Sequence, residues 1–191
     1  MKPLADPYAS GVLKPSVHGQ LVAGIKTYAA NANITPERIW TSLYDTDASQ
    51  DESQYIKAFR RQAMNENYGL VFVGKDPTRN VVDAMANLAG AMVRNFCRAR
   101  IMCVAEVFDI MEERGFPEHT CLLIPDFHLE SSIKQPAPKG WASKLTSLLF
   151  DRQTRGLQTV LYVSDMSDLK LEYGRAISRL IETSYQIVEV D

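Results

Sequence analysis

The 191-residue sequence lacks the features that mark several classes of protein. Its three cysteines, Cys97, Cys103 and Cys121, show no CxxC spacing and the three histidines are scattered, so no metal site is expected. No stretch approaches the roughly 20 consecutive apolar residues of a membrane span. The N-terminus has no apolar segment of a secretory signal. We therefore expect a soluble, cytoplasmic protein with free thiols and no membrane partner.

The sequence also lacks a surplus of positive charge. It holds 21 Lys and Arg residues against 23 Asp and Glu residues, a net charge of -2, which is unlike a protein that coats nucleic acid. Hydrophobic residues make up 46% of the chain and charged residues 23%, which is ordinary for a globular protein and excludes global disorder. The length suits one α/β domain with a short appendage.

What the sequence does contain is a regular alternation of short apolar runs with segments of helical periodicity. The apolar runs predict strands at 69–73, 100–105, 120–124, 158–163 and 185–190. The periodic segments predict helices at 52–65, 80–96, 107–114, 141–155 and 169–181. Strands that alternate with helices predict a three-layer α/β fold, with a parallel sheet covered by helices on both faces.

The first part of the chain has a different composition. Proline and glycine recur through residues 1–20, which indicates an irregular arm, and short helices are expected near 20–31 and 37–43. We therefore divide the chain into residues 1–38, an arm with short helices, and residues 39–191, the α/β domain. The loop at 131–140 is rich in proline and separates two of the predicted elements.

A strand, a loop that begins with glycine, and a long helix form the context of a phosphate-binding loop. The loop here reads Gly74, Lys75, Asp76, Pro77, Thr78, Arg79, Asn80 and Val81. Against the pattern G-x-x-x-x-G-K-[ST], the second glycine is Arg79, the lysine is Asn80, and the Ser or Thr is Val81.

The other loop residues also oppose nucleotide binding. Pro77 removes a backbone donor, and Asp76 places negative charge where phosphates would lie. We therefore expect no nucleotide cofactor and no ATPase activity, with an unusual pose on Lys75 as the alternative.

From about residue 39 to residue 190 the order of blocks resembles the AAA+ helicase-loader and transposition-helper family, the DnaC/IstB group. Residues 69–81 resemble the Walker A strand and loop, and CLLIPDFH resembles the Walker B segment, with Pro125 and Asp126 at its acidic positions. QTVLYVSDM resembles the sensor 1 strand, with Asp165 in place of the usual Asn. GRAISRLIE resembles the arginine-finger helix, which implies that Arg175 or Arg179 acts on a neighbour's nucleotide. The resemblance implies a P-loop NTPase core.

Each of these residues also has a structural interpretation. Asp126 could cap the segment that follows it, and the two arginines of the finger helix could lie on a solvated face. A basic group, Arg94, Arg98 and Arg100, could contact DNA phosphates or belong to a solvated helix end. Ser164 has no GxSxG setting and no inferred His or Cys neighbour, so no hydrolase triad is expected and no catalytic residue is assigned.

The resulting hypothesis is a non-hydrolysing, AAA+-like pseudo-ATPase that binds a protein partner, a helicase or another ATPase motor, in DNA replication or on a mobile element. Three alternatives remain open: an inhibitor or decoy of a P-loop motor, a divergent active ATPase, and a weak DNA-binding module. Because AAA+ proteins assemble through bound nucleotide, a chain without it is expected to be a monomer or a small oligomer.

Overall fold

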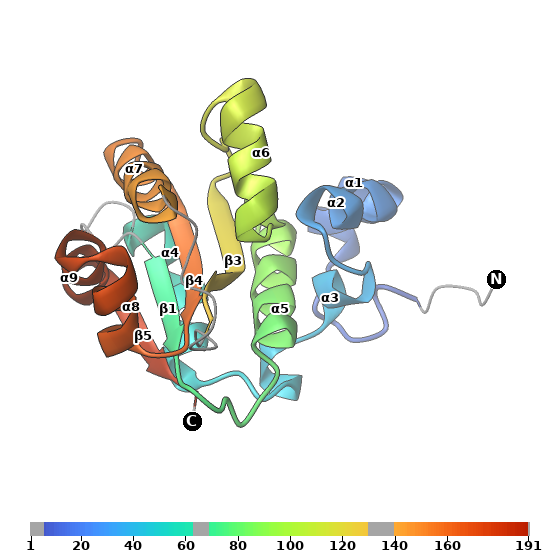
Figure 1. Cartoon of the computed structure of the whole chain (residues 1–191). Helices are drawn as coiled ribbons and strands as arrows, with labels where there is room; N and C mark the ends of the chain where they lie inside the picture. The colour runs from blue at the N-terminus through green and yellow to red at the C-terminus, as the bar shows by residue number, and fades with distance from the viewer. Residues whose placement is uncertain (1–5, 63–68, 130–139, 191) are drawn as a thin grey trace.

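The computed structural model describes residues 6–62, 69–129 and 140–190, and within them a five-stranded sheet with helices on both faces (Figure 1). The strand order is β2-β3-β4-β1-β5, and every neighbouring pair is parallel. The strands are β1 (Gly69–Val73), β2 (Ala99–Ile101), β3 (Cys121–His128), β4 (Gln158–Val163) and β5 (Tyr185–Glu189). This confirms the predicted α/β fold class.

The two faces of the sheet bury two separate apolar cores. Along β1, Leu70 and Phe72 enter one core and Val71 enters the other, as the alternation of side chains in a strand requires. The first core is covered by α1 (Pro15–Ala23), α2 (Ile25–Ala32), α3 (Glu37–Trp40), the 3-10 turn η1 (Leu43–Asp45), α4 (Gln50–Gln62) and α5 (Val81–Arg94). The second is covered by α6 (Val104–Arg114), α7 (Trp141–Thr154), α8 (Met166–Tyr173) and α9 (Arg175–Ser184).

The N-terminal segment is more ordered than the sequence indicates. Residues 15–23 form α1, which begins inside the expected irregular arm of residues 1–20, with Pro15 at the first helical position. Leu13, Leu21 and Ile25 are buried in the same core as α5, and in Figure 1 α1, α2 and α3 lie beside α5. The irregular arm was predicted from the frequency of proline and glycine in this segment. That prediction was wrong because proline is compatible with a helix start and Gly19 is tolerated on the exposed side of a short helix.

The boundaries of β2 and β3 also differ from the prediction. β2 ends at Ile101 and α6 begins at Val104, because an apolar run does not distinguish a strand from the buried start of a helix. β3 continues through Pro125 to His128 instead of ending at 124. Pairing with β2 stops at Leu123, and the register with β4 shifts between Ile124 and His128, so Pro125 lies at an irregularity where no regular ladder bond is required of it.

The remaining elements agree more closely. The helix expected at 169–181 is two helices, α8 and α9, because Gly174 adopts a φ of 90° between them. The helix expected at 52–65 runs from Gln50 to Gln62, and its predicted end lies outside the described residues, as does nearly all of the loop expected at 131–140. Among the helices of the described ranges, none has the length and apolar character needed to cross a membrane.

Candidate functional site

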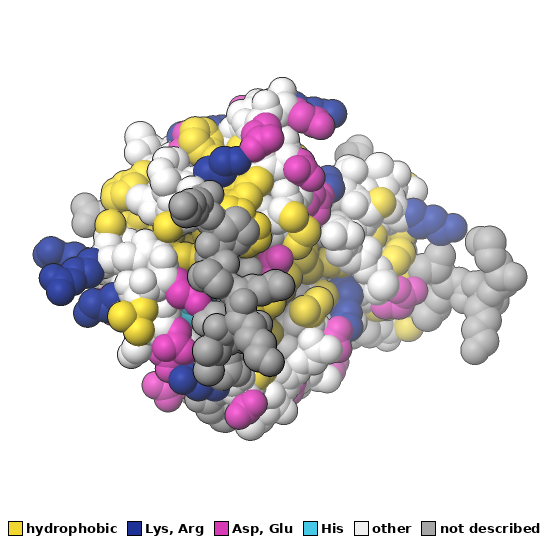
Figure 2. Space-filling view, in the orientation of Figure 1, with side chains coloured by type: hydrophobic (Ala, Val, Ile, Leu, Met, Phe, Trp, Pro, Cys, Tyr) yellow, Lys and Arg dark blue, Asp and Glu magenta, His cyan; other side chains and the backbone are white. Residues whose placement is uncertain are grey.

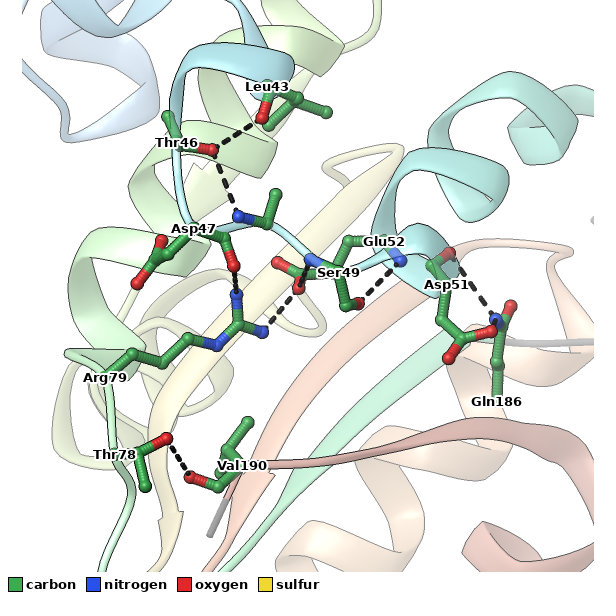
Figure 3. Close-up of polar contacts among 11 residues, drawn as sticks. Leu43, Thr46, Asp47, Ser49, Asp51, Glu52, Thr78, Arg79, Gln186 and Val190 are labelled. Atoms are coloured by element: carbon green, nitrogen blue, oxygen red, sulfur yellow. Dashed lines mark hydrogen bonds and ion pairs between the residues drawn. The ribbon is translucent and has the colours of Figure 1, made fainter.

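The loop between β1 and α5 is tied to the sheet at both of its ends. The backbone N–H of Gly74 donates to the carbonyl of Val163 at 3.2 Å, and the Tyr162 hydroxyl donates to the Gly74 carbonyl at 2.8 Å. Near the other end, the backbone N–H of Thr78 donates to the carbonyl of Val190 at 2.7 Å. The Thr78 hydroxyl donates to the same carbonyl at 3.3 Å (Figure 3). Two backbone donors of the loop are therefore bound to protein carbonyls, where a phosphate cradle would turn such donors toward the ligand.

Arg79, which replaces the second glycine, turns inward and fastens the loop to α4 (Figure 3). Its side chain is only 12% exposed and forms an ion pair with Glu52 at the start of α4. Its guanidinium also donates to the carbonyl of Asp47 at 3.0 Å and lies 5.2 Å from the centre of the Phe72 ring. Glu52 in turn accepts from the backbone N–H of Ser49 at 2.8 Å. The guanidinium is therefore held between the start of α4 and the Phe72 ring.

The first turn of α5 is capped by the protein itself. The Asn80 side chain accepts a hydrogen bond from the backbone N–H of Asp83 at 3.2 Å, so a capping amide satisfies a donor that could otherwise bind an anion. Val81 is buried in the first core. At the positions of the lysine and the Ser or Thr of a Walker A motif, the chain thus presents a capping residue and a core residue.

A cavity of about 510 Å³ separates the loop from the residues that follow β4. Lys75 crosses it, with its ammonium 3.3 Å from Asp165 and 3.7 Å from Asp168. Asp165 also caps α8, and the backbone N–H of Asp168, with that of Ser167 and the Lys75 side chain, lowers the pKa of its carboxyl group. With Asp76 also at the wall, carboxylates outnumber the single ammonium, and the local charge repels a triphosphate.

In the segment that resembles Walker B, the carboxylate of Asp126 is engaged in a structural hydrogen bond. Asp126 accepts a hydrogen bond from the backbone N–H of Val104, at 2.9 Å, and so caps the first turn of α6. Partial burial raises the pKa of Asp126, which this hydrogen bond opposes. Pro125 beside it offers no carboxylate.

The sequence did not connect three polar residues that lie together at the ends of β3 and β4 and on α8: Ser164 and His128 are buried, and Glu172 is partly exposed. The Ser164 hydroxyl is 3.2 Å from Nδ1 of His128, and Nε2 of His128 is 3.3 Å from a carboxylate oxygen of Glu172. Burial lowers the pKa of His128, and the carboxylates of Glu172, Asp168 and Asp165 oppose that effect. Their proximity could have been predicted from the sequence, because β3 and β4 are neighbouring parallel strands whose ends lie side by side. Since Ser164 is only 3% exposed, we read the group as a polar network that joins β3, β4 and α8.

The arginines identified in the sequence fall in different environments. Arg175 and Arg179 lie exposed on α9, at the edge where Figure 2 shows a group of basic side chains. Arg94 donates to the carbonyls of Ile39 and Thr41, and burial lowers its pKa.

The other two members of the basic group are Arg98 and Arg100. Arg100 forms an ion pair with Glu106 at 2.7 Å, whereas Arg98 is exposed. Arg98 and Arg100 line one cavity, and Arg94 is not part of it. Across the described ranges, no group of three or more His, Cys, Asp or Glu residues is arranged to hold a metal ion.

Comparison with known proteins identifies solved structures that have a similar fold. No model of a protein family matches the sequence, and no curated protein matches it. The DnaC helicase loader is 14% identical with a TM-score of 0.57, over 81% of this chain and 99% of that one. DnaI is 17% identical with a TM-score of 0.52, over 83% and 92%. Replication initiator DnaA, bound to AMPPCP and single-stranded DNA, is 9% identical with a TM-score of 0.58, over 76% of this chain and 47% of its own.

At these identities the comparisons establish the fold. The chain has a five-stranded parallel α/β fold similar to that of the DnaC helicase loader, which confirms, at the level of the fold, the resemblance drawn from the order of the sequence blocks.

Proposed function

We propose that this AAA+-type core is a non-hydrolysing pseudo-ATPase that serves as a protein-binding accessory factor in DNA replication, of a cell or of a mobile element. In this role it docks on an ATPase motor such as a replicative helicase. The similarity to a helicase loader over 99% of that chain supports the replication setting. The contacts that the loop makes within the protein support the loss of nucleotide binding and hydrolysis.

The single observation that carries the proposal is the inward position of Arg79. Its ion pair with the buried Glu52 connects the loop to α4. To open a phosphate cradle, the chain would have to expose this pair or leave a buried carboxylate without a partner, which is strongly unfavourable. The cap by Asn80 and the two carboxylates around Lys75 also oppose phosphate binding in the loop.

Titration calorimetry with ATP and Mg²⁺ tests the loss of nucleotide binding. We expect no micromolar binding that depends on Lys75, the cation nearest to a phosphate position in the loop. Micromolar affinity in the natural chain that disappears in Lys75→Ala would contradict the proposal. Dependence on Lys75 is the criterion because it identifies the loop as the site of binding.

A second experiment tests the partner. The chain is mixed with the replicative helicase of its source, and complex formation and helicase loading onto a DNA fork are measured. We expect a complex and faster loading, and we expect Arg175→Ala with Arg179→Ala to reduce the gain. Lys170→Ala, on the neighbouring helix α8, is the matched control. Suppressed loading would indicate a decoy, and the absence of any complex would contradict the proposed partner.

A further inference from the structure

A second cavity, of about 530 Å³, lies beside β2, which is an edge strand of the sheet. It is formed where α5 ends and β2 begins, with α1 and α2 on its other side, whereas the loop follows the end of β1. Its lining is mixed: Leu21 is apolar, Tyr28 and Phe96 are aromatic, and Arg98 and Arg100 are basic. A volume of this size and a lining of this kind are typical of a small-molecule site.

Phe96 occupies a position where a large side chain is unfavourable. It follows the C-cap of α5 with a φ of 60°, in the left-handed region that glycine and asparagine prefer. Its backbone N–H donates to the Val93 carbonyl at 2.9 Å, which holds the chain in this turn. The ring is nevertheless 60% exposed and stacks on His18 with 5.7 Å between the ring centres. A strained backbone that presents an aromatic ring at a cavity is an indication of function.

The polar part of the cavity holds groups that the protein leaves incompletely satisfied. Nε of Arg100 and Nδ1 of His119 are buried, and the part of the chain that the structure describes offers neither of them a hydrogen-bond partner. Burial, reinforced by Arg100 and Arg98, lowers the pKa of His119 to about 4, so its ring is neutral at pH 7. Buried polar atoms without partners are rare in folded proteins, and here they accompany an exposed guanidinium, that of Arg98.

We propose that this cavity binds a nucleotide unit, with the base stacked against Phe96 and the phosphate held by Arg98 and Arg100. Base stacking on an aromatic ring and charge-assisted hydrogen bonds from guanidinium groups are the two interactions that recognise such a unit without regard to sequence. The unit belongs either to a free mononucleotide or to a single strand, and both present the same chemistry. The assignment does not rest on the proposed function, since none of the residues that line this cavity belongs to the loop at 74–81.

The experiment uses AMP and a 5′-phosphorylated twelve-residue oligothymidylate as separate probes for the full chain, with dissociation constants from calorimetry and from fluorescence anisotropy. Phe96→Gly removes the ring and relieves the left-handed backbone, so we expect the variant to fold. We expect it to weaken binding about tenfold, the effect of losing one stacked base. Arg98→Ala is expected to weaken binding by a similar factor and to reduce its dependence on salt.

Two exposed residues, one aromatic and one positively charged, serve as controls. Phe150→Ala removes an exposed ring on α7, and Lys170→Ala removes a positive charge on α8; neither residue lines the cavity. Binding of either probe that falls in the cavity variants and persists in both controls supports the proposal, and the probe that binds identifies the source of the nucleotide.

Two results would overturn the assignment: no binding of either probe, or binding unchanged in Phe96→Gly and Arg98→Ala. Binding of AMP that is lost in Lys75→Ala but kept in Phe96→Gly would overturn it too, and would at the same time contradict the proposed loss of the loop site.

Discussion

Arg79 is the residue on which the shape of the degenerate loop depends. Arg79→Ala leaves Glu52 buried without its cation and also removes the bond to the Asp47 carbonyl. We expect the free energy of unfolding to fall by about 3 kcal/mol, because loss of one partner of a buried pair leaves an uncompensated charge. Equilibrium unfolding in urea measures the change.

The double variant Arg79→Met with Glu52→Gln distinguishes the charge from the packing. It removes both charges, so we expect it to be more stable than Arg79→Ala alone. A double variant as unstable as Arg79→Ala would show that the shape of the guanidinium, and not its pairing, holds the loop.

His119 gives the stability of the chain a dependence on pH. Its pKa in the folded protein is about 4, against an ordinary 6.5, because it is partly buried beside Arg100 and Arg98. The unfolded chain therefore binds a proton between these values and the folded chain does not, so the stabilisation is complete above pH 6.5 and is lost as the pH falls toward 4. Glutamine at this position cannot take up a proton. Between pH 7 and pH 4.5 we therefore expect the free energy of unfolding of His119→Gln to fall by about 1–2 kcal/mol less than that of the natural chain, after allowance for solvent screening. Urea unfolding at the two pH values checks this, and equal losses would contradict it.

At the scale of elements, the sequence predicts the strands better than it predicts what surrounds them. Runs such as 69–73 and 158–163 are found as expected because a buried parallel strand is apolar throughout its length. The extension of β3 through Pro125 was not predicted, since it depends on where β2 stops pairing. The division of the last helix at Gly174 depends on a backbone angle that sequence periodicity does not reveal.

Gly90 determines how closely α3 approaches α5. A Cβ at this position would lie 2.1 Å from the backbone carbonyl oxygen of Arg38, so Gly90→Ala forces the two helices apart. Although alanine favours a helix, we expect a net loss of about 1–3 kcal/mol, as is usual for overpacking. Gly19 in α1 is the matched control: a Cβ there meets nothing within 4 Å, so Gly19→Ala should stabilise the protein by about 0.5–1 kcal/mol. Thermal unfolding of both variants tests the contrast, and two changes of the same sign would contradict it.

At the scale of the whole molecule, the sequence indicates which loop residues depart from a phosphate-binding motif but not what takes the place of the ligand. Glu52 and Arg79 are 27 residues apart, and no local pattern connects them. The cavity beside Phe96 could not be predicted from the sequence either. Tyr28 and Leu21 reach it from helices that the sequence did not place beside α5. Sites made by packing between distant segments require the fold.

The last prediction concerns the N-terminal segment, which packs on α5 as part of the first core. Leu13, Leu21 and Ile25 are buried there, and the Arg38 guanidinium donates to Asn87 at 2.8 Å and to Asp83 at 2.6 Å, both on α5. A fragment of residues 39–191 would expose this face of α5, and we expect it to lose its cooperative thermal transition, because the apolar area left in water has no other cover. A peptide of residues 1–38 added to the fragment should restore the transition at saturating concentration. A fragment that unfolds cooperatively by itself, at the temperature of the full chain, would instead establish a domain boundary near residue 38.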